Sequence, residues 1–387
     1  MASRYGCAVL VTVWSLAVAS GLSYAQESPY LYGIHDHEPD PQEYLDHLRN
    51  AGVSGWVTAT AAIGSNPNET DGGDFRWLAD QGFTVIVRLI HGSFPNGSIP
   101  QPSQYHDFAR RAANYVAASR GADHFVIGHE TNLAREWPLR KGGLRYVSPQ
   151  DYARCFRLAY DAINAVRPQA RVLSQALAPF AGPYPAGSNE GYPHAANPLN
   201  WVQYLHQMLS AIRNSGGIDG MALHLSSRGY RREDIHSQKK ITANGQLLYS
   251  SFYVYQDWVQ LGIPRELYHL PLYATQVDGT DDWSGGKQEK SEAHYQRGWL
   301  QEVYAEIRRY NRAAAAAGTP LFRCLNLFRW CAWCGGWNID ASPYKGDILA
   351  DLDEAVSFRF RSASGCEASV DTSSWKGEYF CQPVAFG

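Results

Sequence analysis

Short apolar segments alternate with amphipathic ones along most of this 387-residue chain, and this alternation limits the possible folds more than any other feature. Most of the apolar segments are nearly continuous runs, as expected of parallel strands that are buried on both faces. The eight predicted strands cover residues 32–36, 55–60, 83–90, 125–130, 170–178, 218–226, 268–276 and 322–330. Amphipathic helices are predicted between strands, over residues 105–119, 149–166, 200–215 and 289–317.

Eight strands that alternate with helices over about 300 residues predict an α/β protein with a (β/α)8 TIM barrel. We place this domain at residues 28–358. A doubly wound open sheet is the alternative, but no glycine-rich phosphate-binding loop follows the first strand. A barrel predicts that a site lies at the carboxyl ends of the strands, although it does not predict the chemistry of that site.

Residues 1–25 are predicted to be a signal peptide. Arg4 precedes an apolar run at residues 7–19, and the small residues Ser23 and Ala25 fit cleavage near Ala25. That run is shorter than the about 20 residues that span a bilayer, and no later segment reaches that length without charges. We therefore expect a secreted protein, extracellular or periplasmic, with no membrane span, and we expect a monomer.

The composition excludes some functions and leaves one clue. With 34 basic and 37 acidic residues, the chain lacks the positive charge that attracts nucleic acid, so no nucleic-acid partner is expected. A hydrophobic content of 45% excludes disorder. The 14 Phe, 12 Trp and 24 Tyr make an aromatic content of 13%, which remains to be explained.

Six cysteines follow the signal peptide, and an exported protein can pair them. Cys331 and Cys334 form a C-x-x-C motif, which suits a tight disulfide, half of a zinc site or a redox pair. A structural role is favoured, because only Cys324 lies near enough to add a zinc ligand. Cys366 and Cys381 are predicted to form a second disulfide near the end of the chain.

Residues 359–387 form a short C-terminal tail. Residues 362–374 are rich in serine and are predicted to be a linker. The segment 375–380 that follows is strand-like and resembles the opening strand of a protective-antigen-type β-sandwich module, often sugar-binding. We therefore interpret the tail as a linker and a fragment of a possible second module.

The fourth predicted strand ends in Gly128-His129-Glu130, which places a carboxylate at the tip of an apolar run. Here the chain resembles the clan A glycoside hydrolases, retaining (β/α)8 enzymes whose fourth strand ends in Gly-Asn-Glu. The resemblance implies that Glu130 is the general acid/base, which protonates the glycosidic oxygen and then activates water. His129 stands where the family usually carries an Asn that binds the sugar 2-hydroxyl. A His also donates one hydrogen bond, with a different reach and a titratable charge.

The seventh predicted strand departs from the family pattern. Its ending resembles the nucleophile strand of the clan, but Gln276 stands where the family carries Glu. A carboxamide cannot act as the nucleophile, and three explanations stay open: a natural pseudoenzyme that only binds sugar, an engineered Glu→Gln variant, or replacement by a neighbouring carboxylate. Asp278 would face the same side as Gln276 if the strand continued, and Asp281 and Asp282 follow in the same loop. At about 6.5–9.5 Å from Glu130, such a carboxylate could be the base of an inverting mechanism.

The resemblance extends to other strand ends. It implies that Arg88 braces the nucleophile position and that His224 is an active-site residue at the end of strand six. Trp330 corresponds to an aromatic platform beneath the sugar, and Trp333 and Trp337 follow on the same loop. Sugar rings stack their C–H faces on aromatic rings, which would account for part of the aromatic content.

At the end of the first predicted strand, residues 35–38 are four consecutive residues whose side chains can bind a metal ion. Neighbouring residues on a strand point to opposite sides, so at most two could face one ion. A polar ring that holds sugar hydroxyls, with Asp36 in the cleft, is favoured over a metal site.

Together these observations predict a secreted protein that binds or hydrolyses an oligo- or polysaccharide, without a cofactor or a metal. Two alternatives remain: a carbohydrate-binding pseudoenzyme, and a redox or metal enzyme built on Cys331, Cys334 and the histidines of strand one. The predicted cleft consists of Asp36, Arg88, Glu130, His224, Gln276 and Trp330.

Overall fold

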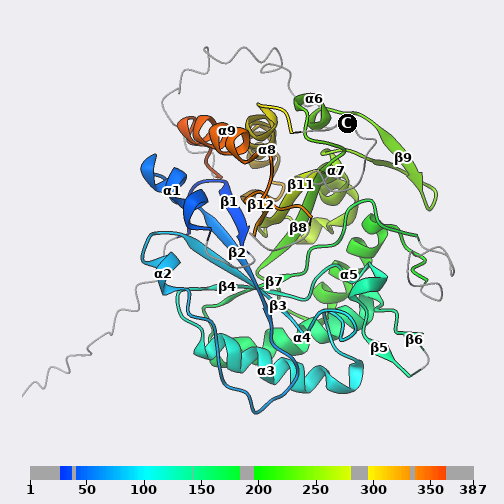
Figure 1. Ribbon diagram of the computed structural model, residues 1–387. Helices are drawn as coiled ribbons and strands as arrows, with labels where there is room; N and C mark the ends of the chain where they lie inside the picture. Colours follow the sequence, from blue (N-terminus) through cyan, green and yellow to red (C-terminus); the bar gives the residue numbers. More distant parts are fainter. Residues whose placement is uncertain are drawn as a thin grey trace, which may run out of the picture.

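The computed structural model describes residues 27–36, 41–141, 143–183, 196–279, 295–331 and 336–362, which form a closed barrel of parallel strands surrounded by helices (Figure 1). The predicted (β/α)8 TIM barrel is therefore confirmed. Its last strand pairs with its first. In barrel order, the strands are β1 (Tyr32–Asp36), β2 (Trp56–Ala62), β3 (Thr84–Ile90), β4 (His124–Ile127), β7 (Arg171–Ser174), β8 (Gly220–Ser227), β11 (Leu272–Gly279) and β12 (Phe322–Trp330).

Helices and short turns connect the strands and cover the outside of the barrel (Figure 1). The α-helices are α1 (Gln42–Asn50), α2 (Arg76–Ala79), α3 (Tyr105–Ala118), α4 (Pro149–Val166), α5 (Trp201–Ser215), α6 (Arg232–Ile235), α7 (Val254–Asp257), α8 (Trp299–Ala317) and α9 (Lys345–Ser357). A π-helical turn, η3 (Trp258–Gly262), follows α7, and the 3-10 turns are η1 (Pro102–Gln104), η2 (Ala134–Glu136) and η4 (Arg265–Leu267). Two hairpins pair β5 (Leu139–Arg140) with β6 (Gly143–Leu144) and β9 (Lys240–Ala243) with β10 (Gln246–Tyr249).

Local sequence explains where the long helices begin. Ser148 caps α4 by accepting a hydrogen bond from the backbone N–H of Asp151 at 3.0 Å, and Pro149 occupies the first helical position. Asn200 caps α5 in a capping box with Gln203. These signals are readable in the sequence, and the observed starts agree with the predicted ones to within one residue.

The structure changes several predicted boundaries. Strands β1 and β12 have the predicted bounds, but β4 ends at Ile127 and not at residue 130. Strand β11 begins four residues later than predicted and continues to Gly279. Helix α8 begins at Trp299, and most of the extra residues predicted for it lie outside the described part of the chain. The two hairpins were not predicted.

The interior of the barrel has an apolar floor with a polar layer above it. The floor consists of one buried side chain from each of seven strands and of Ala176, which follows β7: Trp56, Ile86, Val126, Leu173, Ala176, Ala222, Tyr273 and Cys324. A second, larger apolar cluster packs the outer faces of the strands against the helices. Arg88 lies two residues beyond Ile86 on β3, and His224 lies two residues beyond Ala222 on β8, so each pair is on the same side of its strand. The change from apolar to polar therefore occurs near the carboxyl ends of the strands.

Some predictions fall partly or wholly outside the described residues. No helix in the described ranges is long and apolar enough to cross a membrane. Cys155 and Cys324 are buried free thiols. The signal peptide, the tail from residue 363 and the cysteines at 334, 366 and 381 are not described, so their predicted roles stay predictions.

Candidate functional site

A tight turn after β4 places Glu130 over the barrel. Gly128 has φ 79°, a conformation that suits glycine, and a Cβ there would lie 3.1 Å from Ile99. Glu130 also has a positive φ of 41°, and its backbone N–H donates to the carbonyl of Ala176 at 3.0 Å. A non-glycine residue in this region is uncommon and often marks a functional position. The turn ends strand β4 and leaves the Glu130 side chain 5% exposed.

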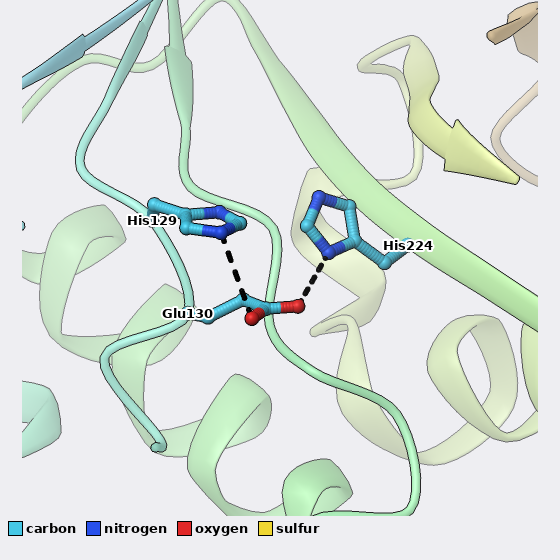
Figure 2. Close-up of side chains that lie close together, drawn as sticks. All are labelled: His129, Glu130 and His224. Carbon is cyan, nitrogen blue, oxygen red and sulfur yellow. Dashed lines mark hydrogen bonds and ion pairs between the residues drawn. The ribbon is translucent and has the colours of Figure 1, made fainter. Parts of the chain in front are cut away.

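Three nitrogen-bearing side chains surround the Glu130 carboxylate. Figure 2 shows two of them, His129 and His224. His224 Nδ1 lies 2.8 Å from Oε1, Arg135 Nη2 lies 3.0 Å from Oε2, and His129 Nε2 lies 3.6 Å from Oε2. Burial by itself would raise the pKa of Glu130, but these neighbours lower it below its usual range. Glu130 is therefore ionised at neutral pH.

The two histidines are neutral donors toward this carboxylate. Burial lowers the pKa of His224, so its Nδ1–H donates to Glu130, while its buried Nε2 has no hydrogen-bond partner in the described structure. Burial and Arg88 hold the pKa of His129 well below its usual range. Arg88 Nη1 donates to His129 Nδ1 at 2.9 Å, so the proton of His129 is on Nε2, which faces Glu130.

Arg88 orients His129 in this structure. Its guanidinium is buried and donates to His129 and, at 3.1 Å, to Thr60 Oγ1. Burial lowers its pKa to about 10, so it stays charged at neutral pH. The resemblance implied that Arg88 braces the position of Gln276, but its hydrogen bonds go to β2 and to the loop after β4.

His129, Glu130 and His224 have the spacing of a metal site, because their candidate ligand atoms all lie within 4.8 Å of one another. Two imidazoles and one carboxylate are a known ligand set for transition metals. However, Arg88 uses the Nδ1 lone pair of His129 and leaves a protonated Nε2 facing the carboxylate. A protonated nitrogen cannot coordinate, and the charge of Arg135 repels a cation, so the donor set does not fit a metal.

Gln276 and Asp278 lie on the strand next to His224. In the pairing of β11 with β8, Gln276 is opposite His224 and Asp278 is opposite Ser226. Because β11 continues to Gly279, both side chains fall on one side of the strand, and Gln276 Nε2 donates to Asp278 Oδ2 at 2.8 Å. The nucleophile position of the resemblance therefore has a carboxyl group beside it.

Asp278 differs electrostatically from Glu130. Asp278 is 7% exposed, and no salt bridge among the described residues includes it. Burial raises the pKa of Asp278 to about 7; hydrogen bonds from Gln276 and Ser226 oppose this shift, and the charge of Glu130 adds to it. The site thus holds one ionised carboxylate and one carboxyl group whose pKa is raised to about 7.

Sequence reasoning missed Arg135 and Glu136, which belong to η2. Arg135 contacts Glu130, and its Nε lies 3.6 Å from Glu136 Oε1. Burial and then the charge of Glu130 raise the pKa of Glu136 to about 7. Charged residues in a loop are typical of solvent-exposed positions, so the sequence carried no signal that this turn folds back onto the site.

The structure separates the predicted tryptophans. Trp330 is 3% exposed and packs outside the barrel, with its ring 6.3 Å from that of Tyr44 on α1 and 4.9 Å from Lys345 Nζ on α9. This position leaves no ring face open, so the platform role does not fit Trp330. The cause is a bulge: β1 residue 35 pairs with residue 328, whereas residue 36 pairs with Trp330, so the alternation of β12 is broken between them.

Trp337 is the predicted tryptophan that lies beside the site. It is 37% exposed, and its Nε1 donates to the carbonyl of Gly279 at 3.0 Å, one residue past Asp278. Trp333 and the side chain of Asp36 fall outside the described part of the structure, as do Asp281 and Asp282. Among the predicted residues, the structure thus brings together Arg88, His129, Glu130, His224, Gln276, Asp278 and Trp337.

Comparisons with known proteins find similarity in fold. No model of a known family matches the sequence, and no curated protein matches it. A family 39 glycoside hydrolase from the gut symbiont Bacteroides cellulosilyticus WH2 is 13% identical with a TM-score of 0.47, over 85% of this chain and 65% of that one. An endo-β-1,3-glucanase of family GH128 from Sorangium cellulosum is 14% identical with a TM-score of 0.44, over 84% of this chain and 98% of that one. Endoglucanase Cel5A from Pseudomonas stutzeri is 12% identical with a TM-score of 0.43, over 87% of this chain and 95% of that one.

Proposed function

We propose that this chain is a secreted glycoside hydrolase that cleaves an O-glycosidic bond of an oligo- or polysaccharide, with Glu130 and Asp278 as its catalytic carboxyl groups. The observation that carries the proposal is the difference between these two groups at one end of the barrel. Glu130 is buried and ionised, whereas burial raises the pKa of Asp278 to about 7. Glycoside hydrolysis requires one carboxyl group in each state, and carboxyl pairs with opposed pKa shifts identify such assignments.

Gln276 has a supporting role in this proposal. Its amide cannot form a glycosyl ester, but it donates a hydrogen bond to Asp278 and so holds the carboxyl group in place. Replacement of the family nucleophile by a neighbour is therefore the explanation that we adopt among the three left open by the sequence.

The surroundings of the carboxyl groups suit a sugar. Trp337 offers a partly exposed ring beside the end of β11, on which a pyranose could stack. The side chain of Arg135 is 60% exposed next to Glu130 and can donate to sugar hydroxyls. The proposed reaction needs no cofactor or metal. The N-terminal segment 1–25 supports action outside the cytoplasm.

A carbohydrate-binding protein without catalysis is the second candidate. It is favoured by Gln276, because the position that carries the nucleophile in the resembling family cannot act as one. On this alternative Gln276→Glu would create hydrolysis in a protein that otherwise only binds sugar.

The test is a screen of the purified protein against aryl glycosides and polysaccharides, with Glu130→Gln as the decisive variant. We expect hydrolysis that falls by at least about 10³-fold in Glu130→Gln, while the melting temperature shows a folded protein. The matched control is Glu233→Gln, because the Glu233 side chain is 64% exposed, and it should keep full activity. Sugar binding without hydrolysis would establish the binding protein, and the absence of both would reject the proposal.

A further inference from the structure

The two carboxyl groups of the site are held in opposite ways. Each oxygen of Glu130 has a nitrogen partner, His224 for Oε1 and Arg135 for Oε2. The described contacts of Asp278 come from neutral groups: the amide of Gln276 at 2.8 Å and the hydroxyl of Ser226 across the strand pair. The structure therefore stabilises the anion at Glu130, and among the described residues no cation pairs with Asp278.

We infer that Asp278 is the general acid of this site and that Glu130, ionised in the resting protein, is its general base, whereas the resemblance implies that Glu130 protonates the glycosidic oxygen. The inference rests on the proposed function and specifies its mechanism. The hydrogen bond from Gln276 occupies Asp278 Oδ2 and leaves Oδ1 to carry the proton. Gln276 is then a positioning residue.

The chemical step follows from this division. The proton on Asp278 passes to the glycosidic oxygen as the C1–O bond breaks, and the bonding electron pair leaves with that oxygen as an alcohol. Glu130 stabilises the positive charge that develops at C1 and takes a proton from the water whose oxygen bonds to C1. The step ends with Asp278 ionised and Glu130 protonated, and exchange of one proton with solvent restores both groups.

The charged and titratable neighbours support the same division. Around Glu130 are His129, His224 and Arg135, and the pKa of Glu130 is lowered. Among the described residues, the charged group that acts on Asp278 is Glu130, whose negative charge disfavours a second anion. A group with a pKa of about 7 suits an acid that must give up its proton near neutral pH.

Glu136 is a second carboxyl group near the site with a raised pKa, and its geometry does not suit the acid role. It lies on the same turn as Arg135, which carries the cation that contacts both Glu136 and Glu130. Glu136 is therefore on the Glu130 side of the site, whereas Asp278 comes from a different strand. This makes Glu136→Gln the matched control for Asp278→Asn.

The experiment compares two glycosides of the same sugar, one with a poor leaving group such as an alkyl alcohol and one with 2,4-dinitrophenolate. An acid catalyst matters only for the poor leaving group. We expect Asp278→Asn to lose about 10²–10⁴-fold on the alkyl glycoside and less than about 10-fold on the dinitrophenyl glycoside. Glu130→Gln should lose activity on both by a similar factor, and Glu136→Gln should affect both equally.

A second measurement uses the pH profile of kcat/KM for the alkyl glycoside. The wild-type protein should show a decline near pH 7 that the dinitrophenyl glycoside does not show. The inference would be overturned if Glu130→Gln or Glu136→Gln lost more activity on the alkyl glycoside than on the dinitrophenyl glycoside, while Asp278→Asn lost the same on both. The proposed function would still stand. A folded wild-type protein that hydrolyses neither substrate would refute the proposed function, and the inference with it.

Discussion

The burial of Asp278 makes the stability of the whole barrel depend on pH. The pKa of this carboxyl group rises from 3.8 to about 7 on folding, chiefly through burial. The difference is about 3 units, and at about 1.4 kcal/mol per unit it amounts to about 4 kcal/mol. Because the folded state holds the proton more tightly, the contribution of Asp278 to the free energy of unfolding is largest below about pH 4. It then falls as the pH rises, until the loss is complete near pH 7.

The substitution Asp278→Asn removes this dependence, because an amide does not ionise. For a barrel of this size the entropy of unfolding is roughly 0.7 kcal/mol/K, so about 4 kcal/mol corresponds to about 6 °C in melting temperature. We expect the melting temperature of the variant, relative to the wild type, to increase by about 6 °C between pH 4 and pH 8.

Scanning calorimetry at intervals between pH 4 and pH 8 provides the assay, with Asp80→Asn as the control. Asp80 is exposed, so its substitution should leave the difference from the wild type constant. A difference that also stays constant for Asp278→Asn would show that the Asp278 carboxyl group is hydrated. The argument for a buried acid would then fail.

Three further predictions concern single features of the structure. Gly128→Ala should lower the free energy of unfolding by about 1–2 kcal/mol in urea titrations, because φ is 79° there; no loss would show that the turn can relax. Asn200→Ala should cost about 1–2 kcal/mol by the same measurement, since it removes the cap that accepts from the Gln203 N–H at 2.8 Å; an unchanged midpoint would contradict a role for the cap. Dialysis against a chelator should leave the melting temperature unchanged, because Arg88 occupies His129 Nδ1; a decrease would reveal a bound metal.

The fold could be predicted because its signals are local. A strand buried on both faces must be apolar along its length, and a helix on the barrel surface must be amphipathic, so each element is recognisable in its own sequence. The start of α4 at Pro149 is similarly determined by a cap and a proline. The position of Glu130 next to a strand end was also predictable, because β4 is an apolar run that stops at a glycine.

The boundaries of strands were less predictable where the backbone departs from regular geometry. Strand β4 stops at Ile127 because the chain turns at Gly128 and Glu130. The bulge near the end of β12 places Trp330 against α1 and α9, outside the barrel. An alternating pattern in the sequence cannot reveal a single inserted residue. One such residue is enough to move the side chains that follow it to the opposite face of the strand.

The sequence by itself determined that this protein is a barrel with carboxyl groups and an amide at its strand ends. Only the tertiary structure decided their electrostatic states. His224, the partner of Glu130, lies 94 residues away, and Arg135 returns from a turn that looks solvent-exposed in sequence. Asp278 has a raised pKa because packing buries it and the charge of Glu130 adds to the shift. A pKa depends on desolvation and on charges nearby in space, and neither is encoded in the order of residues along a strand.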